Sequence, residues 1–332
     1  AIVATRGPAA AVAARVADLR AGDWPAEALE VVVALDATTP AAERTAIMAL
    51  ADPARAVRVV DGDAPGGKAA ALNAGVRASA GEILVFSDTA QRFERDAIAR
   101  LVAALHADPR TRLVGGALQL PGDAPGARRS PVEWYWALER RLRAAEARLH
   151  STIGVSGSIY AVRREAWAEM PAGLILDDVW LPMRRVLAGE RVGYVLDARA
   201  WDVRRTDAEQ EKDRKVRTLT GNFQLVAWLP GLLVPVRNPV WLQFVLHKLA
   251  RLVTPWCVLV AVVAGAVAIA MAFPRAALVA AGSALAALVL GAIVAPGPVR
   301  RVRALLAWGG AANGALVQAT INGVRGKWEV WK

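Results

Sequence analysis

The sequence is poor in the side chains that form disulfides and zinc sites. It holds one cysteine, Cys257, and three scattered histidines, His106, His150 and His247. A single cysteine excludes intramolecular disulfides and metal sites built from cysteine pairs. The scattered histidines argue against a histidine-based zinc site, and the apolar surroundings of Cys257 argue against a thiol nucleophile. The chemistry of the chain therefore depends on its carboxylates and basic residues.

Acidic residues are outnumbered as well. Among 332 residues, 41 Lys and Arg against 30 Asp and Glu give a formal net charge of +11. Hydrophobic residues nevertheless make up 55% of the chain, and the aromatic residues do not alternate with basic ones as base-stacking platforms do. The basic excess therefore points to an anionic membrane surface or an anionic substrate, and nucleic acid is not an expected partner.

Charge is missing altogether from two long C-terminal stretches, residues 252–273 and 276–296. Each has about the length that crosses the hydrocarbon core of a bilayer. A third apolar stretch, residues 304–324, contains Asn313, Gln318 and Asn322. We predict two transmembrane helices and a third candidate within a domain of residues 252–332. The alternative is a buried helix pair of a soluble protein.

Residues 211–251 carry Lys and Arg beside Trp228, Trp241 and Phe244. This composition is typical of helices that lie in the membrane interface. The alternative is a set of amphipathic helices packed on the preceding domain.

The basic residues Arg300, Arg301 and Arg303 follow the second predicted span. The positive-inside rule then favours the cytoplasm for this segment and, two spans earlier, for the N-terminal domain. We therefore expect a multi-pass protein of the cell inner (plasma) membrane with a cytosolic catalytic domain. The chain also begins abruptly within a strand-like run, so we expect further residues before it, transmembrane helices among them.

Residues 1–210 alternate short apolar runs with segments of helical period. The runs are LEVVVALD, AVRVVDG, EILVFSD, RLVGGALQL and RVGYVLDARAWDV, after a first strand-like run AIVATRGP. This alternation predicts an α/β domain with a mostly parallel sheet covered by helices on both faces.

Acidic residues stand where strand-like runs end. Asp36 and Asp88 each end one such run, and Asp177 and Asp178 follow a third, GLIL. In open α/β sheets ligands bind beyond the carboxyl ends of the strands. Each acid taken alone is equally well explained as a helix N-cap or loop residue. With Lys68 between them, the four acids mark a candidate site.

The order of several motifs resembles the membrane-bound family 2 glycosyltransferases, which include cellulose, chitin, hyaluronan and poly-N-acetylglucosamine synthases. The motifs are VVVALDATT, GGKAAALNAG, LVFSDTA, GVSGSIYAVRREAW, LILDDVWLPMRRVLAGERVGYVLDARA and RKVRTLTGNFQ. The resemblance covers nearly the whole chain. It implies a GT-A, Rossmann-like fold and the transfer of sugar from a nucleotide-sugar donor, a UDP-sugar, with inversion at the anomeric carbon.

The resemblance also assigns the donor site. Asp36 matches the acid that contacts the nucleoside, and Lys68 matches a lysine beside the nucleotide. Asp88 matches the first acid of the family's metal motif, which implies Mg2+ or Mn2+ bound between carboxylate and diphosphate. Ala90 replaces the second acid, so diphosphate oxygens and water have to complete the coordination. The alternative is an inactive or metal-independent relative.

The acidic pair and a small-residue segment are assigned in the same way. Asp177 and Asp178 match the family's acidic pair, in which Asp178 takes the place of the general base that removes the acceptor proton. The acceptor-side segment is matched by Ser156, Gly157 and Ser158, although GVSGS is equally consistent with a tight turn.

RKVR occupies the place of a diphosphate-binding motif. Arg217 matches its arginine and Arg214 stands at its glutamine position, so both are assigned to the donor. Thr218 stands where the synthases have a tryptophan that stacks on the acceptor sugar, which weakens the expectation of a gripped polymer. A solvated basic face is the alternative.

The leading functional hypothesis is a processive synthase that extends a polysaccharide at the cytosolic membrane face and passes it through the membrane. One alternative is a nonprocessive transferase that adds a single sugar to a membrane lipid, giving a glycolipid product. The other is an inactive membrane protein that binds nucleotide-sugar without turnover.

Overall fold

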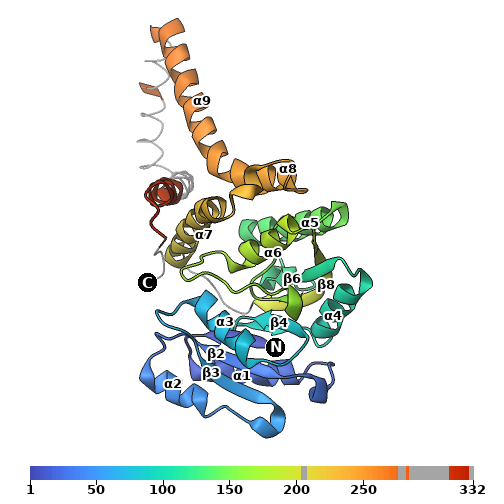
Figure 1. Ribbon diagram of the computed structural model, residues 1–332. Helices are drawn as coiled ribbons and strands as arrows, with labels where there is room; N and C mark the ends of the chain where they lie inside the picture. Colours follow the sequence, from blue (N-terminus) through green and yellow to red (C-terminus); the bar gives the residue numbers. More distant parts are fainter. Residues whose placement is uncertain (203–207, 276–281, 284–313, 329–332) are drawn as a thin grey trace. The chain divides into compact units, whose positions relative to one another are not determined.

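The computed structural model describes residues 1–202, 208–275, 282–283 and 314–328 (Figure 1). The chain divides into two compact units. Unit 1 comprises Ala1–Arg205, Gln224–Phe244 and Trp328–Lys332, and unit 2 comprises Thr206–Phe223 and Val245–Lys327. The predicted span 276–296, apart from residues 282–283, and the first part of the span 304–324 lie outside the described residues.

Unit 1 is built on an eight-stranded sheet with the order β3-β2-β1-β4-β7-β6-β8-β5. The strands are β1 (Ile2–Thr5), β2 (Val31–Leu35), β3 (Val57–Asp61), β4 (Ile83–Ser87), β5 (Gln91–Phe93), β6 (Thr111–Gln119), β7 (Tyr160–Arg163) and β8 (Arg191–Asp202). The apolar runs predicted six of them. Because β7 pairs antiparallel with both β4 and β6, and β5 pairs antiparallel with β8, the expected mostly parallel sheet is a mixed one.

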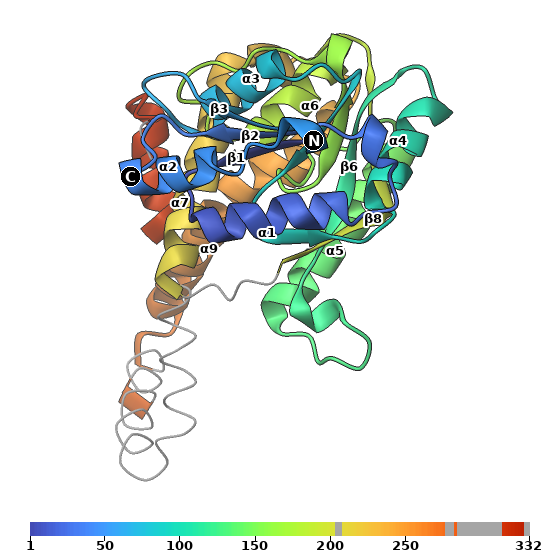
Figure 2. The ribbon, with the colours of Figure 1, turned by 90° about the horizontal axis from the view of Figure 1, so that it is seen from below.

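Helices cover both faces of this sheet, as predicted. Along β1 and β2 the side chains alternate between the faces. Val33 packs with α1 (Ala9–Arg20) and α2 (Ala41–Met48), whereas Ile2 faces α3 (Lys68–Ala78). Figure 2 shows α1 and α3 on opposite sides of β1 and β2. A Cβ on Gly75 would lie 2.8 Å from Ile2 Cγ2, so this glycine allows α3 to approach the sheet.

Three further helices of unit 1 pack on the second half of the sheet. They are α4 (Ala97–Ala107), α5 (Pro131–Leu149) and α6 (Asp177–Leu187). Short 3-10 turns lie between the elements of the chain, at Ala26–Ala28, Pro53–Arg55, Pro121–Asp123, Arg164–Ala166 and Pro230–Leu233. The strand-like run before Asp177 is not a strand. Residues 174–176 are buried in a loop, and the Ile175 amide donates to Gln224 Oε1 (2.9 Å) instead of to a neighbouring strand.

The C-terminal part of the described chain is helical. It contains α7 (Ala208–Trp228), α8 (Trp241–Phe244), a π-helical turn (Val245–Leu249), α9 (Ala250–Ala272) and a helix over residues 314–324. The predicted span 252–273 falls on α9. Within the described residues, no single helix has both the length and the apolar composition needed to cross a membrane. The segments Trp241–Thr254 and Trp256–Ala272, bent by 42°, have them only as a pair.

Candidate active site

The sequence-predicted acids of unit 1 meet at one edge of the sheet. Because β2 and β4 both run parallel to β1, their carboxyl ends lie at the same edge. Asp36 directly follows β2, and Asp88 directly follows β4. Lys68 is the first residue of α3 and Asp177 the first residue of α6, so two helices also begin at this site.

Lys68 lies at the centre of the site. Its Nζ is 3.1 Å from Asp88 Oδ1 and 3.4 Å from Asp177 Oδ2. Burial alone would lower the pKa of Lys68, but the three carboxylates around it, which include Asp178, raise that pKa above its ordinary value. Lys68 is therefore an ammonium at any physiological pH. We call Lys68, Asp88, Asp177 and Asp178 the acidic cluster.

Asp177 is the buried member of the acidic cluster. The pKa of its carboxyl is raised to about 6, mainly by burial and also by the neighbouring acids, against the lowering effect of Lys68. Its Oδ2 forms the ion pair with Lys68 but has no hydrogen-bond partner in the part of the chain that the structure describes. Asp177 can therefore hold or release a proton close to neutral pH.

Asp178 and Gly157 line the accessible side of the cluster. Asp178 is only partly buried, and its backbone carbonyl accepts a hydrogen bond from the Val155 amide (2.9 Å). A Cβ on Gly157 would lie 3.1 Å from Lys68 Nζ and 3.5 Å from Asp178 Cβ. Glycine at this position therefore lets the chain pass directly beside the cluster.

The GVSGS segment is a tight turn at this place. Gly157 and Ser158 form the turn between Ser156 and Ile159, whose backbones pair. The Ser156 and Ser158 hydroxyls lie 2.8 Å apart and are buried. The segment is therefore a tight turn, which does not conflict with an acceptor-side position. An acceptor-binding role for Ser156, Gly157 and Ser158 stays a prediction.

Asp36 binds the loop that leads into α3. Its Oδ1 accepts hydrogen bonds from the Thr38 amide (2.8 Å) and hydroxyl (2.7 Å), and its Oδ2 accepts one from the Gly67 amide (2.8 Å). Burial would raise the pKa of Asp36, but these hydrogen bonds lower it below its ordinary value. Gly66 and Gly67 have φ of +104° and +98°, which favours glycine at both positions. Asp36 thus places Lys68, one residue further along the chain.

Arg214 and Arg217 lie on α7 within unit 2, Arg214 exposed and Arg217 partly buried. They are not part of the acidic cluster, which belongs to unit 1. Their assignment to the donor stays a prediction.

Two residues near the cluster were missed by sequence reasoning. Tyr160, the first residue of β7, stacks on Phe86 with ring centroids 4.5 Å apart, and burial together with the three carboxylates raises its pKa well above the ordinary value. On α5, burial lowers the pKa of Arg143, but Glu139 (3.2 Å), with a contribution from Asp178, raises it overall. The only signal in the sequence for the ion pair between Glu139 and Arg143 is their i,i+4 spacing.

The residues near Asp88 could hold a metal ion only if a bound molecule supplied part of its coordination. Over the described ranges no group of three or more His, Cys, Asp or Glu side chains is arranged to bind a metal ion. Asp88, with a side chain 35% exposed, offers a carboxylate at the accessible end of β4. Mg2+ and Mn2+ accept one carboxylate together with phosphate and water oxygens. A helix-capping role for Asp88 is wrong, because β5 follows it and α4 begins only at Ala97.

Known proteins resemble the chain in sequence and in fold. A sequence model described as "Glycosyl transferase family 2" matches residues 1–170, which include Asp36, Lys68 and Asp88. A search of curated proteins found no match.

Two solved structures share the fold. The mannosyltransferase PcManGT from Pyrobaculum calidifontis, in complex with GDP-Man and Mn2+, aligns with a TM-score of 0.68 and 25% identity over 97% of this chain and 86% of its own. GalNAc-T7 with UDP, GalNAc and Mn2+ aligns with a TM-score of 0.50 and 14% identity over 68% of this chain and 47% of its own. Both hold Mn2+, the second of the two cations predicted from the sequence.

Proposed function

The chain belongs to glycosyl transferase family 2, and from this membership we propose that it transfers a sugar from a nucleotide-sugar donor at the acidic cluster. One observation carries the proposal. Lys68 Nζ lies 3.1 Å from the Asp88 carboxylate and 3.4 Å from the Asp177 carboxylate, at the carboxyl edge of the sheet. Lys68 and Asp88 fall within the residues that match the family, 1–170, and Asp177 follows them by seven residues. This edge is where an α/β sheet binds nucleotides.

Asp88 is the proposed protein ligand of a divalent cation, Mg2+ or Mn2+. A cation held there together with the donor would supply positive charge that stabilises the departing diphosphate. Asp88 is the partly exposed carboxylate at the end of β4, and the mannosyltransferase from P. calidifontis has Mn2+ and GDP-Man bound in the same fold. Asp36 holds the loop before Lys68, so the proposed donor contacts of these two residues depend on each other.

Asp178 is the proposed general base. It is partly exposed beside Gly157, so an acceptor hydroxyl can reach its carboxylate and transfer a proton to it. Asp177 is buried and paired with Lys68, which suits it to positioning the ammonium. A base on the acceptor side is consistent with inversion at the anomeric carbon, which is part of the proposal.

The proposed acceptor is a growing polysaccharide at the cytosolic face of the inner membrane. Exposed apolar side chains along α9, among them Val260, Val262 and Ile269, support a membrane location. A single sugar transfer to a membrane lipid is the second candidate. It is favoured by Thr218, an exposed residue without an aromatic ring at the position where the synthases stack the acceptor sugar.

The activity is tested by nucleotide release from a panel of UDP- and GDP-sugars with membrane-reconstituted full chain and Mn2+. A ladder of polymer indicates the synthase, and one organic-extractable glycolipid indicates the lipid transferase. Asp88→Ala should abolish cation-dependent donor binding. Asp178→Asn should keep donor binding and reduce transfer by roughly 100-fold or more. Asp197→Asn, an exposed acid on β8, is the control. Full turnover in excess chelator would contradict the cation's role.

The membrane location has its own measurement. An integral protein stays with the membrane through an alkaline carbonate wash and enters solution only with detergent. Release of the full chain by carbonate alone would remove this part of the proposal without touching the transferase activity.

A further inference from the structure

Helix α5 of unit 1 exposes an apolar stripe. It consists of Trp134, Tyr135, Leu138, Leu142 and Leu149, whose exposed fractions range from 38% to 78%. At 3.6 residues per turn these five side chains fall within roughly 100° of arc, the width of one helix face. We call this face the α5 stripe.

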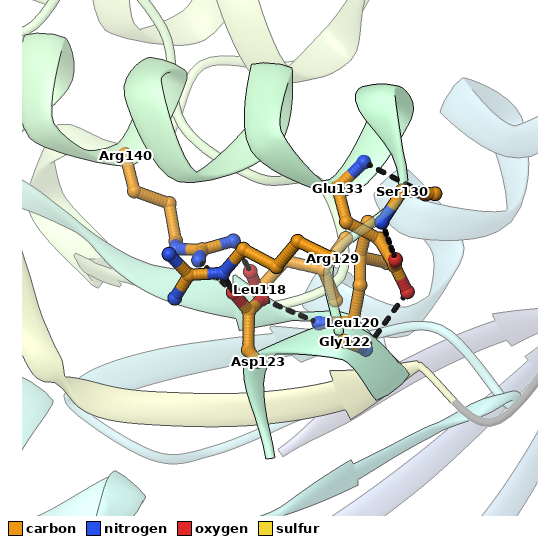
Figure 3. Close-up of polar contacts among 8 residues, drawn as sticks. All are labelled: Leu118, Leu120, Gly122, Asp123, Arg129, Ser130, Glu133 and Arg140. Carbon is orange, nitrogen blue, oxygen red and sulfur yellow. Dashed lines mark hydrogen bonds and ion pairs between the residues drawn. The ribbon is translucent and has the colours of Figure 1, made fainter. Parts of the chain in front are cut away.

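The opposite face of α5 is bound to the domain by buried charged residues. Arg140 donates to Asp123 Oδ1 (2.7 Å) and to the Leu118 carbonyl (3.0 Å), as Figure 3 shows. One turn further, Arg143 pairs with Glu139 (3.2 Å), and all these side chains of α5 are buried. Rolling the helix to bury the stripe would break the contacts of Arg140 with Asp123 and the Leu118 carbonyl, and it would turn the Arg143–Glu139 pair out of its buried position. The stripe is therefore the outer face in the folded unit.

The start of α5 is fixed as well. Ser130 and Glu133 form a capping box, and Glu133 Oε1 also accepts a hydrogen bond from the Gly122 amide (2.8 Å) (Figure 3). The loop between β6 and α5 is thereby tied to the first turn of the helix. A rigid helix presents its apolar face as one continuous surface.

Basic residues border the α5 stripe. Arg141 and Arg148 are exposed and seven residues apart, so they lie along the same edge of the stripe. Exposed Arg128 precedes the helix. The acids of α5 lie elsewhere: Glu139 and Glu146 are buried, and Glu133 is part of the cap. Trp and Tyr beside Leu, with arginine at the edge, is the composition of a helix in a membrane interface.

We infer that the α5 stripe is a docking surface for an anionic lipid bilayer, with its apolar side chains among the headgroups and acyl chains and its arginines on anionic phosphates. The inference rests on the proposed membrane location and adds a contact made by unit 1 itself. The charges favour lipid over a second copy docked through its own α5 stripe, because that stripe would bring the same arginines and no exposed acid of α5 to meet them.

A single fluorophore at a chosen cysteine tests the inference in the full chain. Vesicles contain phosphatidylserine, and a second set also contains lipids with a doxyl quencher in the acyl chain. Cys257, the exposed native cysteine on α9, reports membrane association of the chain. Cys257→Ala with Leu138→Cys reports the α5 stripe. Cys257→Ala with Arg55→Cys, whose native side chain is 80% exposed outside α5, is the matched control.

Quenching by doxyl lipid at position 138 and not at position 55 is the expected result. Adding Arg141→Glu and Arg148→Glu should weaken that contact by at least about fivefold for each arginine, and high salt should weaken it too. Quenching at Cys257 without quenching at 138 overturns the inference and leaves the membrane location intact. Absence of quenching at all positions overturns both. A fluorophore at 138 that is shielded from water but not quenched indicates a protein cover, and this also overturns the inference.

Discussion

At the scale of single residues, the acidic cluster carries more negative charge than its lysine neutralises. One ammonium, Lys68, faces the carboxylates of Asp88, Asp177 and Asp178. The excess can be relieved in two ways. Asp177 can take up a proton, since its pKa is raised to about 6, or a divalent cation can bind at Asp88. The electrostatics of the cluster therefore favour the cation that the proposed reaction needs.

Asp177→Asn is expected to change how stability depends on pH. A carboxyl whose pKa rises from 3.8 to about 6 on folding binds its proton more tightly in the folded state, so stability decreases as pH rises from about 4 to about 6. At 1.36 kcal/mol per pH unit this contribution is roughly 3 kcal/mol at most. The variant lacks it, so its free energy of unfolding relative to wild type should increase across this window.

Thermal unfolding in detergent from pH 4 to 7 measures this difference. Lys68 stays charged throughout the range, so its loss of one partner adds only a constant offset. Asp197→Asn serves as the control for an exposed acid. Curves for Asp177→Asn and wild type that stay parallel across the window would show that Asp177 titrates normally.

Arg217→Lys tests the donor assignment on α7. Lysine keeps the charge but loses the planar fork that binds a diphosphate through two hydrogen bonds. Loss of one charge-assisted hydrogen bond is expected to weaken donor affinity about tenfold or more. Titration calorimetry with the nucleotide diphosphate measures it, with Arg237→Lys, an exposed arginine outside α7, as the control. Wild-type affinity in Arg217→Lys would support the solvated-face alternative.

At the scale of elements, carboxylates fix where helices begin. Asp36 accepts a hydrogen bond from the Gly67 amide directly before α3. Glu133 accepts hydrogen bonds from the Gly122 and Ser130 amides at the start of α5. Burial raises the pKa of Asp36, but hydrogen bonds from the Thr38 hydroxyl and from the Thr38 and Gly67 amides lower it overall. Hydrogen bonds to Ser130 and from the Gly122 amide lower the pKa of Glu133, so both carboxyls stay ionised at neutral pH. The position of Lys68 and the orientation of the α5 stripe thus depend on acids that face the backbone.

Gly122→Ala is expected to loosen the start of α5. The new Cβ would lie 2.5 Å from Glu133 Oε2, so the carboxylate has to leave the Gly122 amide. Loss of this hydrogen bond and disturbance of the capping box should cost about 1–2 kcal/mol. Hydrogen exchange in the first turn of α5 and the Tm both report it. Gly81→Ala, where the new Cβ makes an ordinary 3.5 Å contact, is the control. Equal Tm values for the two variants would contradict the proposed role of Glu133.

At the scale of the whole molecule, the sequence predicted six of the eight strands and missed β5 and β7. Apolar runs such as VVVAL and ILVFS identified β2 and β4 because all of β2 and all of β4 except its first residue are buried. The strands β5 (QRF) and β7 (YAVR) have three and four residues, and their partners are distant in sequence: Gln91 pairs with Asp202, and Tyr160 with Phe86. No local pattern specifies such pairings, so the mixed sheet could not be derived from periodicity.

The candidate site shows the same division. Asp36 and Asp88 could be located because they follow buried strands, and Asp177 because it belongs to an acidic pair. The burial of Asp177 and the partial exposure of Asp178 could not be predicted from the sequence, because they depend on how the loop at Gly157 packs against α6. The membrane-bound synthase subtype, which rested on the order of the motifs and on the C-terminal hydrophobic stretches, stays a proposal.

Because β8 pairs with β6 but is made much later, one edge of β6 stays open while the chain is being synthesised. Strand β6 ends at Gln119, but β8, which pairs with it from Thr111 to Gln119, ends only at Asp202, 83 residues later. At 5–20 residues per second, a ribosome leaves this edge of β6 unpaired for roughly 4–17 s. An open strand edge is a template for pairing with another chain. A nascent chain released at residue 170 should therefore aggregate, measured by light scattering, where one of residues 1–202 does not. Equal solubility of the two fragments would mean that β6 protects its edge without β8. For this protein, chaperone protection would matter most during the interval before its eighth strand is made.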